Sequence, residues 1–280
     1  MAVFSVSGKH NTVDGTTSTD EITVNGNINT VNAEAGDDSI AVNGNLNDVN
    51  GGGGQDDIVV NGNNNDVSGD NGNDDISLIG QNNTASGGNG NDTITNTGNR
   101  ANISGDNGDD IITSFGNNSS INGDDGNDII TVRGNRNIVT GGKGNDIITL
   151  LGGSFNEVYA GDGNDTVTGS NSAEYIAGDK GDDIIMGNGG NDVIEGGAGN
   201  DTLTGGSDND IFVFEADAFG FTDTITDFVQ GKDKLFIDGF SLGSATPNAD
   251  GTYSFDNGTD VLTIDLGGII LTESDFITAL

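Results

Sequence analysis

The stretch "GGKGNDIIT", from Gly141 to Thr149, joins two kinds of sequence that rarely adjoin. Three glycines and an Asn-Asp pair, which favour turns, come directly before two isoleucines, which favour a buried strand. Similar nine-residue segments recur along the 280-residue chain. A turn followed by a buried strand is therefore the repeated unit of this sequence.

The repeat is clearest in the positions of aspartate. An Asp stands two residues before an aliphatic residue at Asp20, Asp38, Asp56, Asp74, Asp92, Asp110, Asp128, Asp146, Asp165, Asp183, Asp192, Asp201 and Asp210. These positions are 18 residues apart seven times, then 19, then 18, and finally 9 apart three times. A second aliphatic residue lies midway in each long unit, at Val31, Val49, Val67, Ala85, Ile103, Ile121, Val139, Val158 and Ile176. The unit is thus a nonapeptide in two alternating forms, one like "GDNGNDDIS" (69–77) and one like "VNGNINTV" (24–31).

This period predicts an all-β fold. Nine residues can form a turn of about six residues and a strand of about three. Two such units make one coil, and coils stack at about 4.8 Å as a parallel β-roll, a β-solenoid with two nonapeptide half-turns per 18-residue coil. Its core should be a narrow ladder of Ile, Val and Leu. Tight turns require positive φ and close backbone packing, which explains a glycine column at Gly26, Gly44, Gly62, Gly80, Gly98, Gly116, Gly134 and Gly152.

The composition restricts the partners of such a solenoid. The chain has 45 acidic residues against 8 Lys and Arg, and its net charge is −37. It should repel itself unless a cation binds it, and nucleic acid and anionic membrane are not expected as partners. The absence of cysteine excludes disulfides, thiol catalysis and Cys-ligated zinc. We find no apolar run long enough for a transmembrane segment and no N-terminal signal peptide pattern.

The stacked aspartates require a counter-charge. Carboxylates about 5 Å apart repel by around 1 kcal/mol per pair even in water. Ca²⁺ binds six to eight oxygens from carboxylates and backbone carbonyls, and glycine-rich turns leave those carbonyls unshielded. We therefore predict Ca²⁺ as the cofactor, with about ten ions held between successive turns. The predicted ligands are Asp38, Asp56, Asp74, Asp92, Asp110, Asp128, Asp146, Asp165, Asp183, Asp192, Asp201 and Asp210.

The two forms of the nonapeptide predict two different faces. Up to about residue 176 the second form carries neutral Asn, as in "NGNIN" (25–29) and "RGNRN" (133–137). Amides can hydrogen-bond to one another along a ladder, so this face is predicted to bind no metal. Near the C-terminal end, "GNGGND" (187–192) and "GGSDND" (205–210) place Asp192 and Asp210 on the second face. One additional calcium site is predicted there.

The repeated motif resembles the RTX (repeat-in-toxin, haemolysin-type calcium-binding) family, whose nonapeptide reads G-G-x-G-x-D-x-U-x. The matches are "GGGGQD" (51–56), "GDNGND" (69–74), "GGNGND" (87–92), "GDNGDD" (105–110), "GDDGND" (123–128), "GGKGND" (141–146), "GDKGDD" (178–183) and "GGAGND" (196–201). The segments "AEAGDD" (33–38) and "AGDGND" (160–165) lack the first Gly but keep the Asp. The resemblance implies a calcium-binding parallel β-roll.

The composition changes after the repeats. We assign residues 1–14 to an N-terminal cap, 15–210 to the calcium-binding β-roll and 211–280 to a small C-terminal β domain, which holds nine of the twelve Phe residues. The stretch "DTITDFVQGKDKLFIDGF" (223–240) resembles the C-terminal domain of serralysin-type proteases. That resemblance implies an uncleaved C-terminal signal, fitted by "LTESDFITAL" (271–280), and export by the bacterial type I secretion machinery.

No catalytic constellation stands out from the repeats. His10 is the single histidine, the serralysin zinc motif H-E-x-x-H is absent, and paired acids such as Asp109 and Asp110 recur as the calcium turns do. We therefore predict that the protein is not an enzyme. The predicted function is that of a secreted, extracellular calcium-binding protein that folds on export and serves as a structural or interaction module. Extracellular polysaccharide and cell surfaces are its candidate partners.

A row of threonines supports an alternative function. Thr95, Thr113, Thr131, Thr149 and Thr168 follow buried aliphatic residues and should form a flat outward row, as in ice-binding β-solenoids. High β-propensity on an exposed strand explains the same row without any ligand. Ala41, Val59 and Ser77 interrupt it. An ice-binding or cell-surface adhesion protein is therefore the alternative, and a carbohydrate-binding module or hydrolase is less favoured.

Overall fold

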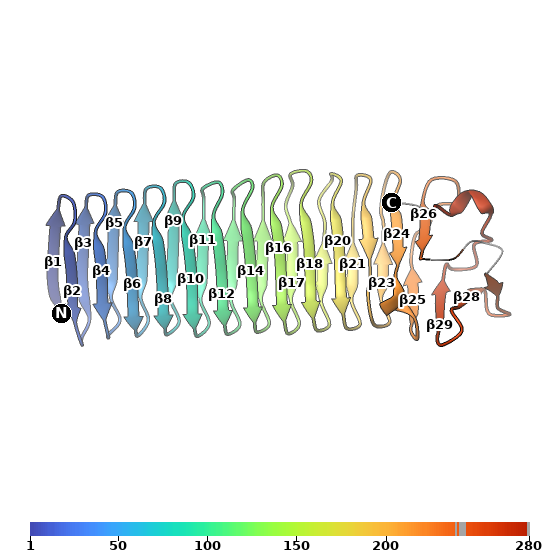
Figure 1. Ribbon diagram of the computed structural model, residues 1–280, viewed down its shortest axis with the longest axis horizontal. Helices are drawn as coiled ribbons and strands as arrows, with labels where there is room; N and C mark the ends of the chain where they lie inside the picture. The colour runs from blue at the N-terminus through green and yellow to red at the C-terminus, as the bar shows by residue number, and fades with distance from the viewer. Residues whose placement is uncertain (239, 241–244, 279–280) are drawn as a thin grey trace. The chain divides into compact units, whose positions relative to one another are not determined.

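Two compact units make up the computed structural model, Met1–Lys143 and Gly144–Leu280, and the structure describes residues 1–238, 240 and 245–278. Within each unit, parallel strands follow one another coil by coil (Figure 1). The predicted all-β parallel solenoid is therefore confirmed. No helix in these described ranges is both long and apolar enough to cross a lipid bilayer.

The first unit contains β1 to β16. Their bounds are β1 Ala2–Ser7, β2 Thr12–Thr16, β3 Asp20–Asn25, β4 Thr30–Glu34, β5 Ser39–Asn43, β6 Asp48–Gly53, β7 Asp57–Asn61, β8 Asp66–Asn71, β9 Asp75–Ile79, β10 Thr84–Asn89, β11 Thr93–Asn96, β12 Asn102–Asn107, β13 Ile111–Ser114, β14 Ser120–Asp125, β15 Ile129–Val132 and β16 Ile138–Lys143. Odd-numbered strands form a first parallel sheet and even-numbered strands a second. Each strand pairs with the strand one coil later, as Ile112 does with Ile130.

The second unit continues the same pattern and then departs from it. Its elements are β17 Ile147–Leu150, β18 Glu157–Asp162, β19 Thr166–Thr168, β20 Tyr175–Lys180, β21 Ile184–Met186, β22 Val193–Glu195, β23 Thr202–Thr204, β24 Ile211–Phe214, the 3₁₀ helix η1 Ala216–Ala218, β25 Thr222–Ile225, β26 Lys234–Ile237, β27 Thr246–Pro247, β28 Thr252–Asp256, β29 Val261–Asp265 and the 3₁₀ helix η3 Glu273–Asp275. The first sheet here runs from β17 through β25 to β29, β28 and β27, and the second from β18 to β26. The pairs β27–β28 and β28–β29 are antiparallel.

The ends of the predicted repeat region take part in the same pairing. Residues of the expected N-terminal cap form β1 and β2, which pair with the next coil through Ala2 and Asp20 and through Thr12 and Thr30. In the expected C-terminal domain, β24, β25 and β26 still pair in parallel with the coils before them. The domain boundaries at 14 and 210 stay predictions. Residues 239, 241–244 and 279–280, including the last two residues of the expected secretion signal, lie outside the described residues.

Side chains alternate between the core and the surface along most of the strands. In β13, Ile111 is 46% exposed whereas Ile112 beside it is 0% exposed. The nine aliphatic residues predicted midway in the units, from Val31 to Ile176, are all buried. The core between the two sheets is therefore the predicted narrow ladder of aliphatic side chains.

The strands are longer than the sequence predicts. The segment Gly69–Asn71 was expected within a six-residue turn, yet it belongs to β8 and pairs with the next coil through Asp70 and Gly88. Both of these residues have positive φ, 72° at Asp70 and 113° at Gly88. The backbone therefore bends inside the paired strand, and only Gly72, Asn73 and Asp74 remain as the turn before β9.

Two adjacent isoleucines test this core. We expect Ile112→Ala to lower the free energy of unfolding by about 2–5 kcal/mol, because it removes buried methyl groups from a core that is one side chain wide. Ile111→Ala, on the exposed side of the same strand, should change it by less than about 0.5 kcal/mol. Denaturant unfolding in calcium measures both, and equal losses would contradict the assigned orientation of β13.

Candidate metal centre

An aspartate ends each turn that leads from the second sheet into the first. Asp56, for example, directly precedes β7, and its side chain points inward. The twelve predicted ligands, from Asp38 to Asp210, are all buried, with exposed fractions of 0–3%. We call the series at this edge the first column: Asp20, Asp38, Asp56, Asp74, Asp92, Asp110 and Asp128 in the first unit, and Asp146, Asp165, Asp183, Asp201 and Asp223 in the second.

One oxygen of each carboxylate is fixed by the neighbouring coil. The backbone N–H of Asp56 donates to Oδ1 of Asp74 at 2.8 Å. The same bond joins Asp92 to Asp110 at 2.7 Å. In the second unit the N–H of Asp183 donates to Oδ1 of Asp201 at 2.9 Å. The carboxylates are therefore held in line and cannot turn towards solvent without breaking a buried hydrogen bond.

The other oxygen of these carboxylates is buried and lacks a donor. Within the described residues, Oδ2 has no hydrogen-bond partner in Asp38, Asp56, Asp74, Asp92, Asp110, Asp165, Asp183, Asp192, Asp201, Asp210 and Asp223. Leaving a buried polar atom unsatisfied costs about 1–3 kcal/mol, and more when it is charged. A repeated cost of this kind indicates a missing cationic partner.

Glycine keeps space open beside this oxygen. A methyl carbon at Gly51 would lie 2.5 Å from Oδ2 of Asp56 and 3.0 Å from the carbonyl oxygen of Gly69 in the next coil. Gly69, Gly87, Gly105, Gly123, Gly178 and Gly187 have the same surroundings in their coils. The glycine thus lies between a carboxylate oxygen and a carbonyl oxygen of successive coils. In "AEAGDD" and "AGDGND" this position is held by the buried residues Ala33 and Ala160.

Burial makes these carboxylates poor acids. Burial is the largest cause of their raised pKa values. Repulsion from neighbouring carboxylates raises the pKa further, and the hydrogen bond from a backbone N–H to Oδ1 lowers it. The pKa rises to about 6 in Asp56, Asp74, Asp92, Asp128, Asp165, Asp201 and Asp210, to about 7 in Asp110 and Asp223, and to about 8 in Asp183 and Asp192. Protons or metal ions are therefore favoured at these buried carboxylates.

Asparagine satisfies the opposite edge without a cation. We call this series the second column: Asn11, Asn29, Asn47, Asn65, Asn83, Ala101, Ser119 and Asn137 in the first unit, and Asn156, Glu174, Asp192, Asp210 and Asp233 in the second. Oδ1 of Asn65 accepts the N–H of Asn47 at 2.8 Å, as the aspartates do. Its Nδ2 donates to the carbonyl oxygen of Gly44 at 3.0 Å. The predicted amide ladder is therefore present, because the amide carries a donor where a carboxylate carries a second acceptor.

Acidic residues enter the second column only in the second unit. Both carboxylate oxygens of Glu174 accept hydrogen bonds from Ser170, at 2.5 Å from Oγ and 3.0 Å from the backbone N–H. Oδ2 of Asp233 accepts the N–H of Val229 at 2.6 Å. Between them, Asp192 and Asp210 are joined by an N–H bond of 3.0 Å. The structure therefore brings Asp192 and Asp210 together, as the sequence predicts for one additional site.

Four acidic members of the columns are not among the ligands that the sequence predicts. Asp20 fits the repeat, and Glu174 stands where the second column mostly carries Asn or Asp. Hydrogen-bond donors already satisfy Asp20, Glu174 and Asp233, so Asp223 is the site candidate among the four. Asp223 and Asp233 lie 22 and 23 residues after Asp201 and Asp210, so they fall outside the 18-residue period. An Asp preceding an apolar strand, as in "DTI" and "DKL", was the signal that could have identified the last two.

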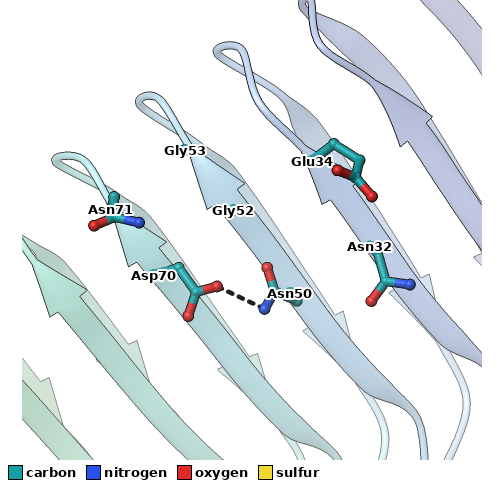
Figure 2. Close-up of a pocket in the computed structure, with 7 residues that line it drawn as sticks. All are labelled: Asn32, Glu34, Asn50, Gly52, Gly53, Asp70 and Asn71. Atoms are coloured by element: carbon teal, nitrogen blue, oxygen red, sulfur yellow. Dashed lines mark hydrogen bonds between the residues drawn. The ribbon is translucent and has the colours of Figure 1, made fainter.

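A groove on the outer face of the second sheet provides a contrast. The groove has a volume of about 440 Å³. Figure 2 shows its lining residues, Asn32, Glu34, Asn50, Gly52, Gly53, Asp70 and Asn71. Nδ2 of Asn50 donates to Oδ2 of Asp70 at 2.6 Å, and Oγ of Ser68 donates to Oδ1 at 2.7 Å. Both oxygens of this surface carboxylate have donors, so the groove does not require a cation as the first column does.

The donor set of the first column fits calcium. No three His, Cys, Asp or Glu side chains in the described ranges converge as a metal-binding group. Any ion must therefore take part of its ligands from peptide carbonyls, which calcium accepts and structural zinc does not. The unsatisfied Oδ2 atoms and the glycine carbonyls beside them would hold it, and the ion would supply the positive charge that these oxygens lack.

Comparison with known proteins supports this chemistry. The family described as the RTX calcium-binding nonapeptide repeat matches in four copies, at residues 79–95, 113–148, 150–185 and 186–218. A family of unknown function, DUF3060, matches residues 6–59. No curated protein matches the chain.

Two solved structures are similar in part. A hyperactive, Ca²⁺-dependent, β-helical antifreeze protein from an Antarctic bacterium has 21% identity and a TM-score of 0.48, covering 85% of this chain and 86% of that one. The extracellular lipase LipA from Serratia marcescens has 20% identity and a TM-score of 0.24, covering 73% of this chain and 40% of the lipase. With TM-scores below 0.5, neither structure indicates what this chain binds.

The raised pKa values predict an unusual pH dependence in chelator. Folded carboxyls with a pKa of about 6 to 8 hold protons more tightly than unfolded ones, whose value is near 3.8. The metal-free fold should therefore be most stable near pH 4 and lose stability as the pH rises through 6 to 8. Far-UV circular dichroism in chelator should show β-structure increasing on acidification from pH 8, and a loss over that range would contradict the assignment.

Two glycines of β6 test the space beside the carboxylate. Gly51→Ala should lower the affinity of one calcium site at least about tenfold, equal to about 1.4 kcal/mol, because the methyl group enters the space between Asp56 and Gly69. The coil should still form, since Ala33 and Ala160 occupy this position elsewhere. Gly53→Ala is the control, because no atom lies within 4 Å of a methyl carbon at Gly53. Calcium titration compares the two, and equal affinities would place the ion elsewhere.

Proposed function

The chain carries RTX calcium-binding nonapeptide repeats, and we propose that it is a secreted bacterial protein whose repeats bind Ca²⁺ between successive coils and fold on export. The observation that carries the proposal is the first column, in which one oxygen after another is buried without a donor. Outside the cell the folded solenoid serves as a structural or interaction module.

Charge supports a dependence of folding on calcium. The chain carries −37, and about ten dications would add roughly +20, leaving roughly −17. The exposed ion pairs Lys143–Asp125 and Lys180–Asp162 join oppositely charged atoms 2.7 Å apart, but such surface pairs contribute little. Without metal, the conformational entropy lost on ordering 49 glycines outweighs the free energy gained by burying a core that is one side chain wide.

The calcium gradient across a cell envelope supports folding on export. Extracellular modules bind calcium with dissociation constants of about 10⁻⁴ to 10⁻³ M. A chain with such sites stays unfolded at low internal calcium, and an unfolded chain can be threaded through the type I secretion machinery. Each ion lies between two coils, so ordering one coil prepares the next and binding becomes steep.

A structural role agrees with the site chemistry. An RTX β-solenoid is a structural fold, and the acids with a buried, unsatisfied oxygen belong to repeated columns rather than to an isolated acid–base pair. We therefore propose a non-enzymatic protein. The outer face of its second sheet presents polar side chains, among them Asp70 and the two residues in register Asn32 and Asn50, which suits polysaccharide or a cell surface as the partner.

Ice binding is the second candidate, and one observation favours it. Thr95, Thr113 and Thr131 lie in register on the outer face of the first sheet. The neighbouring row is apolar at Ile111 and Ile129, which are 46% and 43% exposed. Thermal hysteresis of the calcium-loaded protein distinguishes this function from calcium binding alone, and freezing at the equilibrium melting point would exclude it.

Two adjacent acids test the proposed function. The repeats should be disordered in chelator and β-rich in millimolar calcium, as measured by far-UV circular dichroism. Asp110→Asn should bind fewer ions and require several-fold more calcium for folding, because it removes a buried carboxylate oxygen between two coils. Asp109→Asn makes the same charge change at an exposed position and should fold like the parent.

Two results would contradict this function. One is a repeat region that is already fully β-structured in chelator at neutral pH. The other is an equal calcium requirement for Asp109→Asn and Asp110→Asn.

A further inference from the structure

The first column extends beyond the last RTX repeat. The match to the repeat family ends at residue 218, and Asp223 follows in β25. Asp223 is 1% exposed, and its Oδ1 accepts the N–H of Asp201 at 2.9 Å, as in the coils before it. Its Oδ2 is buried without a hydrogen-bond partner among the described residues. The non-repeat segment therefore contributes a residue with the same deficit as the repeat aspartates.

Other acids near the ends of the columns do not have this deficit. Oδ2 of Asp20 accepts the N–H of Thr16 at 2.6 Å, at the N-terminal end of the first column. In the second column, Oδ2 of Asp233 accepts the N–H of Val229 at 2.6 Å. In both carboxylates, a backbone N–H of a nearby turn thus donates the hydrogen bond that Oδ2 needs. Asp223 has no such donor in the described ranges, which indicates that a cation completes it.

Asp223 lies in β25, the strand that connects the last repeat coil to the C-terminal strands of the first sheet. β25 pairs in parallel with β23 of the last repeat coil and also with β29. β29 in turn pairs with β28 in the antiparallel part of the C-terminal region. The first sheet therefore reaches these C-terminal strands through β25, whose first residues include Asp223.

We propose that a calcium ion binds between Asp201 and Asp223 and fastens β25, β28 and β29 to the last repeat coil. The inference rests on the proposed calcium function of the repeats and extends it to the C-terminal region. The second sheet is joined differently, because β26 pairs with β24 and the carboxylate of Asp233 beside it is already satisfied by Val229. One sheet is thus continued with a metal and the other without one.

The substitution Asp223→Asn removes the predicted calcium ligand but keeps the hydrogen bond that joins the two coils. An amide keeps an oxygen for the N–H of Asp201 and replaces the second oxygen with a donor, as Asn65 does in the second column. Asp233→Asn is the control for the ion count alone: its amide loses the acceptor of the Val229 N–H, which disturbs local hydrogen bonding, but no ion is expected there. Both are made in the full-length chain.

The experiment combines two measurements at saturating calcium. Equilibrium dialysis should find one ion fewer per chain in Asp223→Asn and no change in Asp233→Asn. Hydrogen–deuterium exchange of residues 222–225, 252–256 and 261–265 should be up to roughly a hundredfold faster in Asp223→Asn, the factor expected when a ligand present at a hundred times its dissociation constant is lost. Exchange in β3 to β13 should be the same in all three proteins.

The outcomes are distinguishable. Equal ion counts and equal exchange in the parent and Asp223→Asn overturn the inference while leaving calcium binding by the repeats intact. Loss of an ion in Asp233→Asn as well overturns the distinction between the two sheets. A parent protein that binds no calcium refutes the proposed function itself.

Discussion

Along the first column, from Asp38 to Asp110 and from Asp165 to Asp223, each carboxylate buries an oxygen for which the described residues provide no donor. In Asp74 one oxygen is held by the N–H of Asp56, so the other cannot rotate towards water. Gly69 lacks a side chain at this point, which leaves the oxygen facing a carbonyl of the next coil. The aspartate of the nonapeptide thus supplies the negative charge for an ion, and the glycine leaves space for that ion.

The difference between the two edges of the solenoid comes from the side-chain amide. Asn65 and Asp74 both accept a backbone N–H from the preceding coil, but Asn65 adds a donor and Asp74 adds a second acceptor. The asparagines satisfy one another and the backbone, whereas the carboxylates keep a buried acceptor without a donor in the part of the chain that the structure describes. Under the proposed function, calcium dependence follows the aspartates coil by coil and reaches the second edge where Asp192 and Asp210 replace asparagine.

The sequence period was sufficient for the fold and for most of the candidate site. It identified buried positions such as Ile112 and Ile121, and it identified the stacked aspartates, since residues 18 apart must occupy equivalent positions in successive coils. The sequence period could not predict which atoms form hydrogen bonds. Only the structure shows that Oδ1 accepts a backbone N–H and that Oδ2 has no donor among the described residues. The sequence period also missed Asp223 and Asp233, because longer loops change the spacing to 22 and 23 residues. The length of β8 was mispredicted because Gly69 was expected in a turn.

A crystal structure of the protein grown in calcium, with anomalous scattering to locate the ions, tests the central claim most directly. Within each unit the account predicts ions between successive aspartates of the first column, from Asp38 to Asp128 and from Asp146 to Asp223, and one between Asp192 and Asp210. It predicts none along the asparagines from Asn29 to Asn83. Two equally occupied columns in the first unit, or a first column without ions, would contradict it.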